Sequence, residues 1–156
     1  MDTLKFRNAL GQFATGVCVI TAKTTDGTAF GITVNSFASV SLEPPLVLWS
    51  LRNDSECYVD FESAKYYTIN ILEAGQTALS NQYSKKNQHL LQGDQYRIGK
   101  SGAPVLRGVL TSFECESWQR YDGGDHVILV GRVIEMDVSP GDQPLIFHSG
   151  AYRELR

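Results

Sequence analysis

The stretch Gly31-Ile-Thr-Val-Asn-Ser-Phe-Ala-Ser-Val-Ser-Leu-Glu-Pro-Pro45 places one amide and four hydroxyl groups in an apolar-patterned segment that ends on two prolines. A buried hydroxyl or amide without a hydrogen-bond partner costs about 1–3 kcal/mol. We therefore expect its polar side chains to face water, the backbone or a polar ligand such as a flat heteroaromatic ring; they are Thr33, Asn35, Ser36, Ser39 and Ser41. The alternative is an exposed sheet face, where serine and threonine are also common.

The segments on both sides of this stretch predict a succession of antiparallel strands. Residues 17–24 are rich in β-branched side chains, and Asp26-Gly27 then favours a hairpin into residues 29–36. A second hairpin is predicted over 109–118 and 126–138, because the glycines of 121–125 can adopt positive φ. Further strands are expected at residues 46–51, 66–72 and 145–148.

Short helices accompany these strands. Phe6, Ala9, Leu10 and Phe13 recur at helical spacing behind a cap at Asp2 or Thr3, which predicts a helix that ends by Gly16. Asn53 and Glu56 resemble a capping box that opens a helix through Phe61, and another helix is expected over residues 76–83. We predict one domain over residues 1–156, mainly β, forming a closed or split Greek-key antiparallel β-barrel.

Composition narrows the function classes. The net charge is −3 and the 14 basic residues are scattered, which argues against nucleic acid as a partner. No apolar run is long enough for a membrane span, and the N-terminus does not resemble a secretory signal, so we expect a cytoplasmic protein away from membranes. Cys18, Cys57 and Cys115 are widely spaced, which favours buried free thiols, and no metal-ligand spacing occurs.

A few residues outside the Gly31–Pro45 stretch are candidates for chemistry. His126 follows Gly-Gly-Asp at the start of a predicted strand, where it either contacts a ligand or stabilises the turn. Glu114 and Glu116 share one strand face, which we interpret as solvated rather than catalytic. Residues 84–102 are polar and weakly patterned, and with Lys86 they are the best candidate for a flap over a site.

At this point the sequence resembles the flavin reductase family of FMN-binding split-barrel proteins, which includes reductase components of two-component flavin monooxygenases. The resemblance spans nearly the whole chain. It is carried by Phe6-Arg7, Phe13-Ala-Thr-Gly-Val17, Gly31-x-Thr33-x-Asn35-Ser36-Phe37-x-Ser39-Val40-Ser41-Leu42, Pro44-Pro45-Leu46, Asn70-x-Leu72, Gly102-x-Pro104-x-Leu106, Cys115, Gly124-Asp125-His126, Gly131-Arg132-Val133, Pro144-Leu145 and Gly150-x-Tyr152. Val34 stands where alanine is common in the family, and Tyr83-Ser84 stands where a Phe-Ala pair is common.

The resemblance implies roles for particular residues. The flavin ring and ribityl chain would be surrounded by Thr33, Val34, Asn35, Ser36, Ser39, Val40 and Ser41. Ser50, Leu51, Arg52 and Lys86 would approach its phosphate. His126 and Tyr152 would lie beside the nicotinamide, and His126 would act as the catalytic residue.

The implied activity is NAD(P)H-dependent flavin reduction by hydride transfer from nicotinamide C4 to flavin N5, with FMN or FAD as the flavin and NADH or NADPH as the reductant. The reduced flavin would pass to a partner monooxygenase. The site would form at a homodimer interface. Two alternatives stay open: a flavoprotein that holds FMN tightly and reduces another acceptor, and a non-catalytic flavin-binding module.

Overall fold

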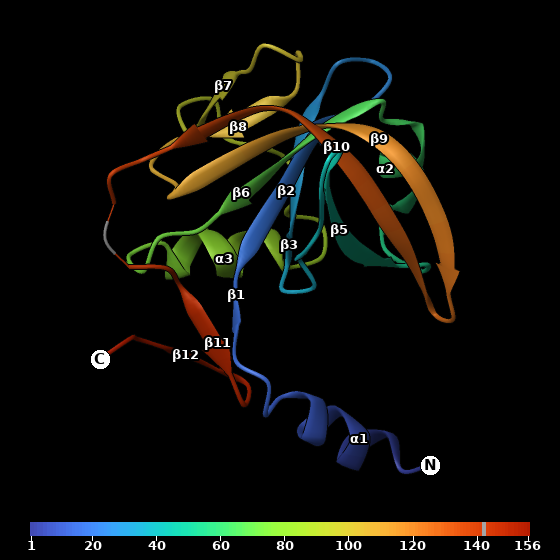
Figure 1. Ribbon diagram of the computed structural model, residues 1–156, viewed down its shortest axis with the longest axis vertical. Helices are drawn as coiled ribbons and strands as arrows, with labels where there is room; N and C mark the ends of the chain where they lie inside the picture. Colours follow the sequence, from blue (N-terminus) through green and yellow to red (C-terminus); the bar gives the residue numbers. More distant parts are fainter. Residues whose placement is uncertain (142) are drawn as a thin grey trace.

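A seven-stranded antiparallel sheet forms the body of the protein in the computed structural model, which describes residues 1–141 and 143–156 (Figure 1). Its strand order is β3-β2-β6-β9-β10-β5-β4. The strands are β2 (Cys18–Lys23), β3 (Ala29–Val34), β4 (Ala38–Leu42), β5 (Pro45–Arg52), β6 (Tyr66–Ile71), β9 (Thr111–Gly123) and β10 (His126–Val138). The predicted mainly β, antiparallel fold is confirmed, and every strand expected in this sheet is present.

The two edge strands of this sheet, β3 and β4, are consecutive in the sequence and are joined by residues 35–37. So short a connection requires the sheet to curl until its edges approach each other. Ser36 marks the meeting point, because its hydroxyl oxygen accepts a hydrogen bond from the Ser50 amide of β5 at 2.9 Å. The hydroxyl also lies 3.2 Å from the Ser50 carbonyl oxygen, to which it donates. The result is a barrel that is split beside β3.

The inside of the curl is filled by large side chains. Trp49 packs edge-on against Phe61 and Tyr67, with ring centroids 4.9 and 5.6 Å apart. Strand β2 is buried over five of its six residues, Cys18–Ala22, because its second face is also covered. That cover includes α3 (Thr77–Tyr83) and the short strand β8 (Pro104–Leu106), which pairs with β7 (Tyr96–Ile98). The continuous β-branched pattern of this segment reflects burial on both faces.

The helices predicted from the sequence are confirmed in part. Helix α1 (Thr3–Leu10) is capped by the Asp2 carboxylate, as predicted, and α3 lies in the expected place. Helix α2 (Tyr58–Ser63) begins later than predicted, and the capping box at Asn53 is wrong. The Asn53 amide instead donates to the Gly124 carbonyl, which ties this segment to the β9–β10 turn. Within the described residues, no helix has the length and apolarity needed to cross a membrane.

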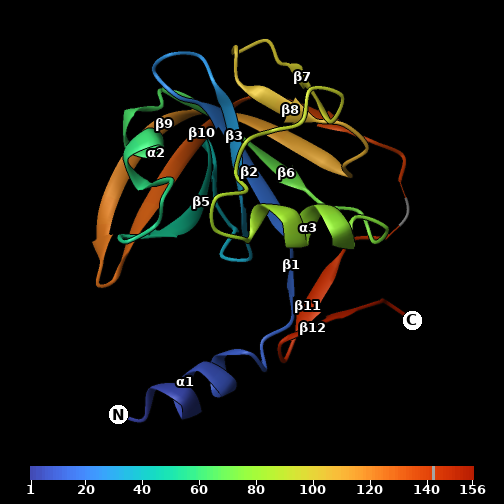
Figure 2. The ribbon, with the colours of Figure 1, turned by 180° about the vertical axis from the view of Figure 1, so that it is seen from behind.

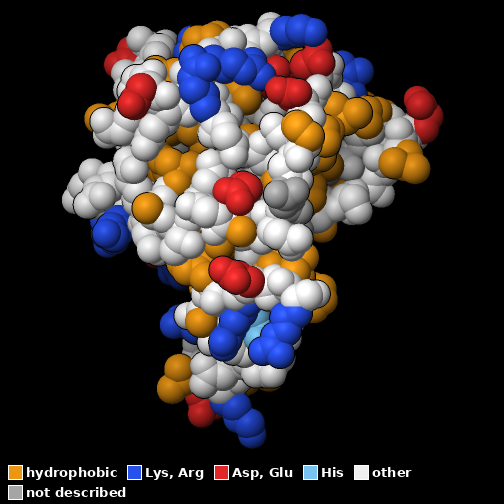
Figure 3. All heavy atoms as spheres, turned by 90° about the vertical axis from the view of Figure 1, so that its left-hand side faces the viewer, with side chains coloured by type: hydrophobic (Ala, Val, Ile, Leu, Met, Phe, Trp, Pro, Cys, Tyr) orange, Lys and Arg blue, Asp and Glu red, His pale blue; other side chains and the backbone are white. Residues whose placement is uncertain are grey.

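An arm extends from the barrel and contains both chain ends (Figures 1 and 2). It consists of α1 and a small sheet of β1 (Thr15–Gly16), β11 (Ile146–His148) and β12 (Ala151–Arg153). The space-filling view shows the molecule narrowing toward this arm (Figure 3). Helix α1 buries none of its residues, and its apolar Leu4, Phe6 and Leu10 are exposed. Strand β12 was not predicted, because three residues are too few to show a periodic pattern.

Two acidic residues and the three cysteines bear on the predictions made from the sequence. Glu114 is buried rather than solvated, because its carboxylate accepts hydrogen bonds from the amide and hydroxyl of Ser101 at 2.9 and 2.6 Å. The prediction of a solvated face is therefore wrong for this residue, whereas Glu116 pairs with Arg132 at 3.1 Å. The three cysteines are free and buried, as predicted.

Candidate active site

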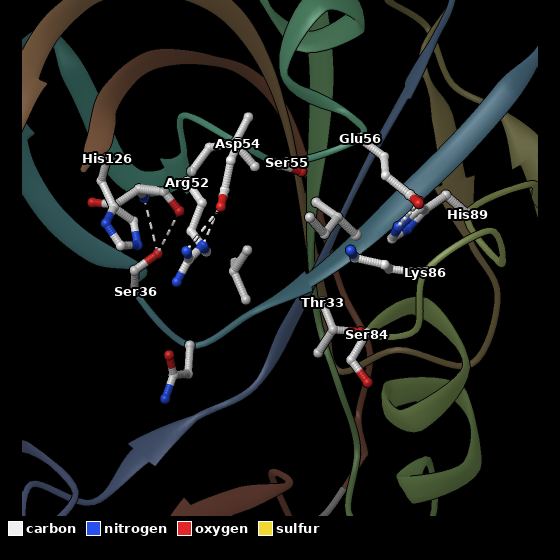
Figure 4. Close-up of a pocket in the computed structure, with 15 residues that line it drawn as sticks. Thr33, Ser36, Arg52, Asp54, Ser55, Glu56, Ser84, Lys86, His89 and His126 are labelled. Carbon is white, nitrogen blue, oxygen red and sulfur yellow. Dashed lines mark hydrogen bonds and ion pairs between the residues drawn. The ribbon is translucent and has the colours of Figure 1, made fainter. Parts of the chain in front are cut away.

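A cavity of about 600 Å³ lies beside the end of β3, where the barrel is split. Its walls come from the Ile32–Ser36 stretch, the end of β5, the 54–56 turn and the segment after α3. Most of the sequence-predicted site residues line it: Thr33, Val34, Asn35, Ser36, Ser50, Leu51, Arg52, Lys86 and His126. The close-up shows Ser36, Arg52 and His126 toward one end, and Lys86, Glu56 and His89 toward the other (Figure 4).

Strand β3 presents backbone hydrogen-bonding groups to this cavity. Some backbone groups of β3 point away from its partner strand β2. Those of Ala29 and Gly31 do so, because the Ala29 carbonyl accepts from the Leu91 amide and the Gly31 amide donates to the His89 carbonyl. Thr33 has the same parity along the strand, so its amide and carbonyl also point away from β2. The Thr33 hydroxyl is already engaged, donating to the Ser80 carbonyl at 2.7 Å. What Thr33 offers a ligand is therefore one backbone donor and one backbone acceptor.

The two cations of the cavity differ in their surroundings. Arg52 makes a bidentate pair with the Asp54 carboxylate, with N–O distances of 2.8 and 3.0 Å. This contact lowers the pKa of Asp54 and raises that of Arg52. Lys86 has no acidic group within 4.0 Å among the described residues. Its ammonium is therefore the cation available to an anionic ligand.

His126 is positioned by the β9–β10 hairpin. The turn consists of Gly124, with φ of 77°, and Asp125, and it puts His126 opposite Arg52 in the β10–β5 pairing. His126 Nδ1 lies 2.6 Å from the Asp125 carboxylate, a contact that lowers the pKa of Asp125. Since a carboxylate only accepts, Nδ1 carries the proton and Nε2 remains for a ligand. The His126 side chain is 38% exposed, so Nε2 can be reached from the cavity.

Tyr152 lies apart from His126 within this chain. Its hydroxyl lies 2.7 Å from the Ser80 hydroxyl and donates to the Asn81 amide oxygen at 3.0 Å. It lines a second cavity of about 400 Å³, between α3 and the arm. The two cavities share wall residues, among them Thr33 and Ser84. The structure therefore puts Tyr152 in a neighbouring cavity that shares the Thr33–Asn35 stretch with the main one.

The remaining predicted residues, Ser39, Val40 and Ser41, do not line the main cavity. They lie on edge strand β4, with a bulge in the pairing to β5 between Ser39 and Ser41. Ser39 and Val40 are exposed, and Ser41 is partly so. Within a single chain, these three residues therefore lie outside the cavity that Thr33–Ser36 line.

Three titratable side chains of the cavity have no ligand-binding role in the interpretation of the sequence. Asp54 lies two positions after Arg52, and Glu56 has the spacing from Asn53 that predicts a helix cap. The third is His89, whose ring is 15% exposed and lies between Gly31 and Glu56. The only signal in the sequence was the polarity of residues 84–102. The contact depends on the fold, which brings residues 56 and 89 together.

Residues 10–156 match the model of the flavin reductase like domain. The chain belongs to the flavin reductase family. It is 46% identical over 151 residues to the FMN reductase (NADH) SmoA of Agrobacterium fabrum, which covers 97% of this chain and 85% of that protein.

Solved structures of flavin reductases superpose closely on this chain. One is the NADH:FAD oxidoreductase SgcE6 of Streptomyces globisporus in complex with NAD and FAD fragments, with TM-score 0.93, 31% identity, and coverage of 99% of this chain and 93% of that one. Another is the styrene monooxygenase flavin reductase of Pseudomonas putida, with TM-score 0.87, 32% identity and 97% coverage of both chains. The split-barrel fold is thereby confirmed.

The residues of the cavity fit a flavin mononucleotide. A volume of about 600 Å³ is within the usual range for a small-molecule site. The backbone donor and acceptor of Thr33 match the alternating N–H and C=O groups of a flavin pyrimidine edge. Lys86 supplies an unpaired positive charge, which suits a phosphate.

Proposed function

We propose that the protein binds FMN or FAD in the cavity beside β3 and catalyses its reduction by NADH. The observation that carries this proposal is the combination, in one cavity, of the Thr33 backbone edge, the unpaired Lys86 and the accessible Nε2 of His126. The identity to SmoA and the superposition on SgcE6 support NADH as the reductant and FMN or FAD as the flavin. The protein is therefore an oxidoreductase.

When bound, the flavin supplies an electrophilic N5 that accepts a hydride from nicotinamide C4. The task of the protein is to hold the two rings in contact and to exclude other orientations. Thr33 fixes the pyrimidine edge, and Lys86 binds the phosphate. His126 Nε2 orients the nicotinamide carboxamide, accepting from its N–H₂ group when neutral or donating to its carbonyl when protonated. Asp125 keeps the His126 ring in the required orientation.

The active form of the protein is proposed to be a homodimer. Support comes from β4, an exposed sheet edge with Val40 49% and Leu42 94% exposed, and from the exposed apolar face of α1 on the arm. Unpaired sheet edges and exposed apolar residues favour association with another chain. A second subunit seated there would bring Ser39, Val40 and Ser41 to the site that the sequence resemblance assigns to them.

The reduced flavin is proposed to serve a separate monooxygenase. Support comes from the styrene monooxygenase flavin reductase, whose fold this chain shares over nearly its whole length. We propose a cytoplasmic location, which suits three free, buried cysteines because the cytosol keeps thiols reduced.

The test of the function is oxidation of NADH by the purified protein, followed by absorbance with FMN, FAD or riboflavin added. Flavin-dependent oxidation is expected, and its absence with all three flavins would contradict the proposal. In His126→Ala, loss of one hydrogen bond to the nicotinamide is expected to slow flavin reduction roughly tenfold in rapid mixing. The FMN dissociation constant should remain within about twofold. Reduction at the wild-type rate would remove His126 from the mechanism.

A further inference from the structure

The segment after α3, residues 84–92, crosses one end of the main cavity and is tied to the edge of β3. The Gly31 amide donates to the His89 carbonyl at 2.8 Å, and the Leu91 amide donates to the Ala29 carbonyl at 3.1 Å. These two bonds extend the sheet by a short stretch beyond β3. They fix the backbone of His89, three residues after Lys86.

The side chains of Glu56 and His89 form a second connection at the same end of the cavity. Glu56 Oε2 accepts from the Asn87 amide at 2.9 Å and lies 3.2 Å from His89 Nε2. The other ring nitrogen of His89, Nδ1, lies 2.9 Å from the Gly31 carbonyl oxygen. Both partners are acceptors, so only a ring protonated at both nitrogens can donate both bonds. The other charged side chains that line the same cavity are Lys86, Asp54 and Arg52.

Asn87 has a backbone conformation that needs such support. Its φ is 61°, in the left-handed region that is unfavourable for residues with a Cβ, although asparagine tolerates it better than most. The bond from its amide to Glu56 holds this turn in place. Lys86 immediately precedes the turn, and in the close-up its ammonium points toward the middle of the cavity (Figure 4). The backbone conformation of Asn87 therefore fixes the position of the Lys86 Cα atom relative to the cavity.

We propose that Glu56 and His89 are positioning residues that hold Lys86 where it binds the phosphate of the flavin. This inference rests on the proposed function and adds the basis of selectivity for flavins that carry a phosphate. Neither residue needs to touch the flavin ring. Their loss should weaken binding of FMN but leave binding of riboflavin, which has the same ring and no phosphate, nearly unchanged.

The direction of the change in FMN affinity distinguishes a change in the position of Lys86 from the loss of the Glu56 charge. Glu56 is an anion in the wall of a cavity proposed to bind another anion. Removing its charge would by itself strengthen phosphate binding. Weaker binding of FMN by Glu56→Ala that disappears in the Lys86→Met background therefore means that Lys86 has moved. Loss of the carboxylate charge has the opposite sign, and loss of a proton from His89 would weaken FMN binding with or without Lys86.

The experiment measures the dissociation constants of FMN and riboflavin from the quenching of flavin fluorescence. Lys86→Met should weaken FMN binding about tenfold, the loss expected for a charge-assisted hydrogen bond. Glu56→Ala should weaken it about fivefold, and His89→Gln about threefold, while riboflavin affinity stays within twofold in each variant. In the Lys86→Met background, Glu56→Ala should cause no further loss. The matched control is Glu62→Gln, which removes an exposed carboxylate of α2 and should change neither constant.

Unchanged or tighter FMN binding by Glu56→Ala, or equal losses for FMN and riboflavin, would overturn the inference. So would a full additional loss from Glu56→Ala in the Lys86→Met background. Riboflavin binding also reports whether each variant folds; if Glu56→Ala fails this test, His89→Gln decides by the same criteria. Failure of the wild-type protein to bind either flavin would instead overturn the proposed function.

Discussion

The two halves of the Gly31–Pro45 stretch have the same polar chemistry and opposite surroundings. Thr33, Asn35 and Ser36 lie at the end of β3 and in the crossing that follows, where they line the cavity. Ser39 and Ser41 lie on edge strand β4, outside it. The first half is organised by this chain alone, because Thr33 bonds to Ser80 and Ser36 to Ser50. The second half pairs with β5, but its hydroxyls make no described hydrogen bond within the chain, and a second subunit that covers β4 would give them partners.

The largest expected effect is on dimerisation, and it comes from a change in the second half of the stretch, on β4. In Val40→Lys, a charge would be buried in the proposed subunit interface, which should weaken dimerisation at least about a hundredfold, equivalent to roughly 3 kcal/mol. Sedimentation velocity measures this at a series of protein concentrations. The matched control is Val59→Lys on α2, an exposed valine outside the arm and β4. A Val40→Lys protein that dimerises like the wild type would place the interface elsewhere.

The next largest effect is on the free energy of unfolding, and it comes from a change in the first half of the stretch, which lines the cavity. Ser36→Ala removes the hydroxyl that accepts from the Ser50 amide and leaves that partly buried group without its partner. The free energy of unfolding should fall by about 1–3 kcal/mol. Ser39→Ala, whose hydroxyl makes no described hydrogen bond within the chain, should change it by less than about 0.5 kcal/mol. Urea denaturation of both variants at the same concentration compares them, and equal losses would remove the distinction between the two halves.

Strand β3 could be predicted from the sequence, whereas edge strand β4 and the division between the two halves could not. Periodicity and turn dipeptides located the hairpins β2–β3 and β9–β10, because those signals are local. The curling of the sheet depends on how its edges meet, and no local pattern encodes that. Polar residues 33–41 were therefore assigned to one site, although the fold of a single chain separates them.

The same limit explains the residues that were missed or misread. Glu114 alternates with apolar neighbours as a solvated residue would, and its burial follows from Ser101, which reaches it from a distant loop. Glu56 and Asn53 had the spacing of a helix cap, but tertiary partners Asn87 and Gly124 bind them instead. Each misreading concerns a polar side chain whose partner is far away in the sequence.

The contribution of the Asp125–His126 pair to stability is expected to depend on pH. This pair lies in the β9–β10 hairpin, beside the cavity. The bond to His126 lowers the pKa of Asp125 below its ordinary value of 3.8. The contribution of the pair to stability should therefore be complete above that value and be lost as the pH falls through the lower, folded-state pKa. Asp125→Asn should be less stable than the wild type at neutral pH, with the difference vanishing in acid. Urea denaturation at several pH values measures this, and a difference that grows in acid would contradict it.

The smallest expected signal is the absence of thiol labelling behind the cavity wall. Cys18 pairs with Val34 across β2 and β3, and burial raises the pKa of its thiol to about 12. Burial likewise raises the pKa of Cys57 and Cys115 to about 12. At pH 8 a disulfide reagent such as DTNB should label none of the three in the folded protein and all of them in urea. Rapid labelling of Cys18 without urea would mean that the strands behind the cavity open.

In the proposed function, the cavity beside β3 holds a flavin where NADH can reduce it. Titration of the purified protein with FMN, followed by addition of NADH in the absence of oxygen, tests this in a single cuvette. The account predicts a saturable change in the flavin spectrum at about one FMN per chain, and then loss of the oxidised flavin absorbance. A spectrum that never saturates, or a bound flavin that stays oxidised in excess NADH, would contradict it.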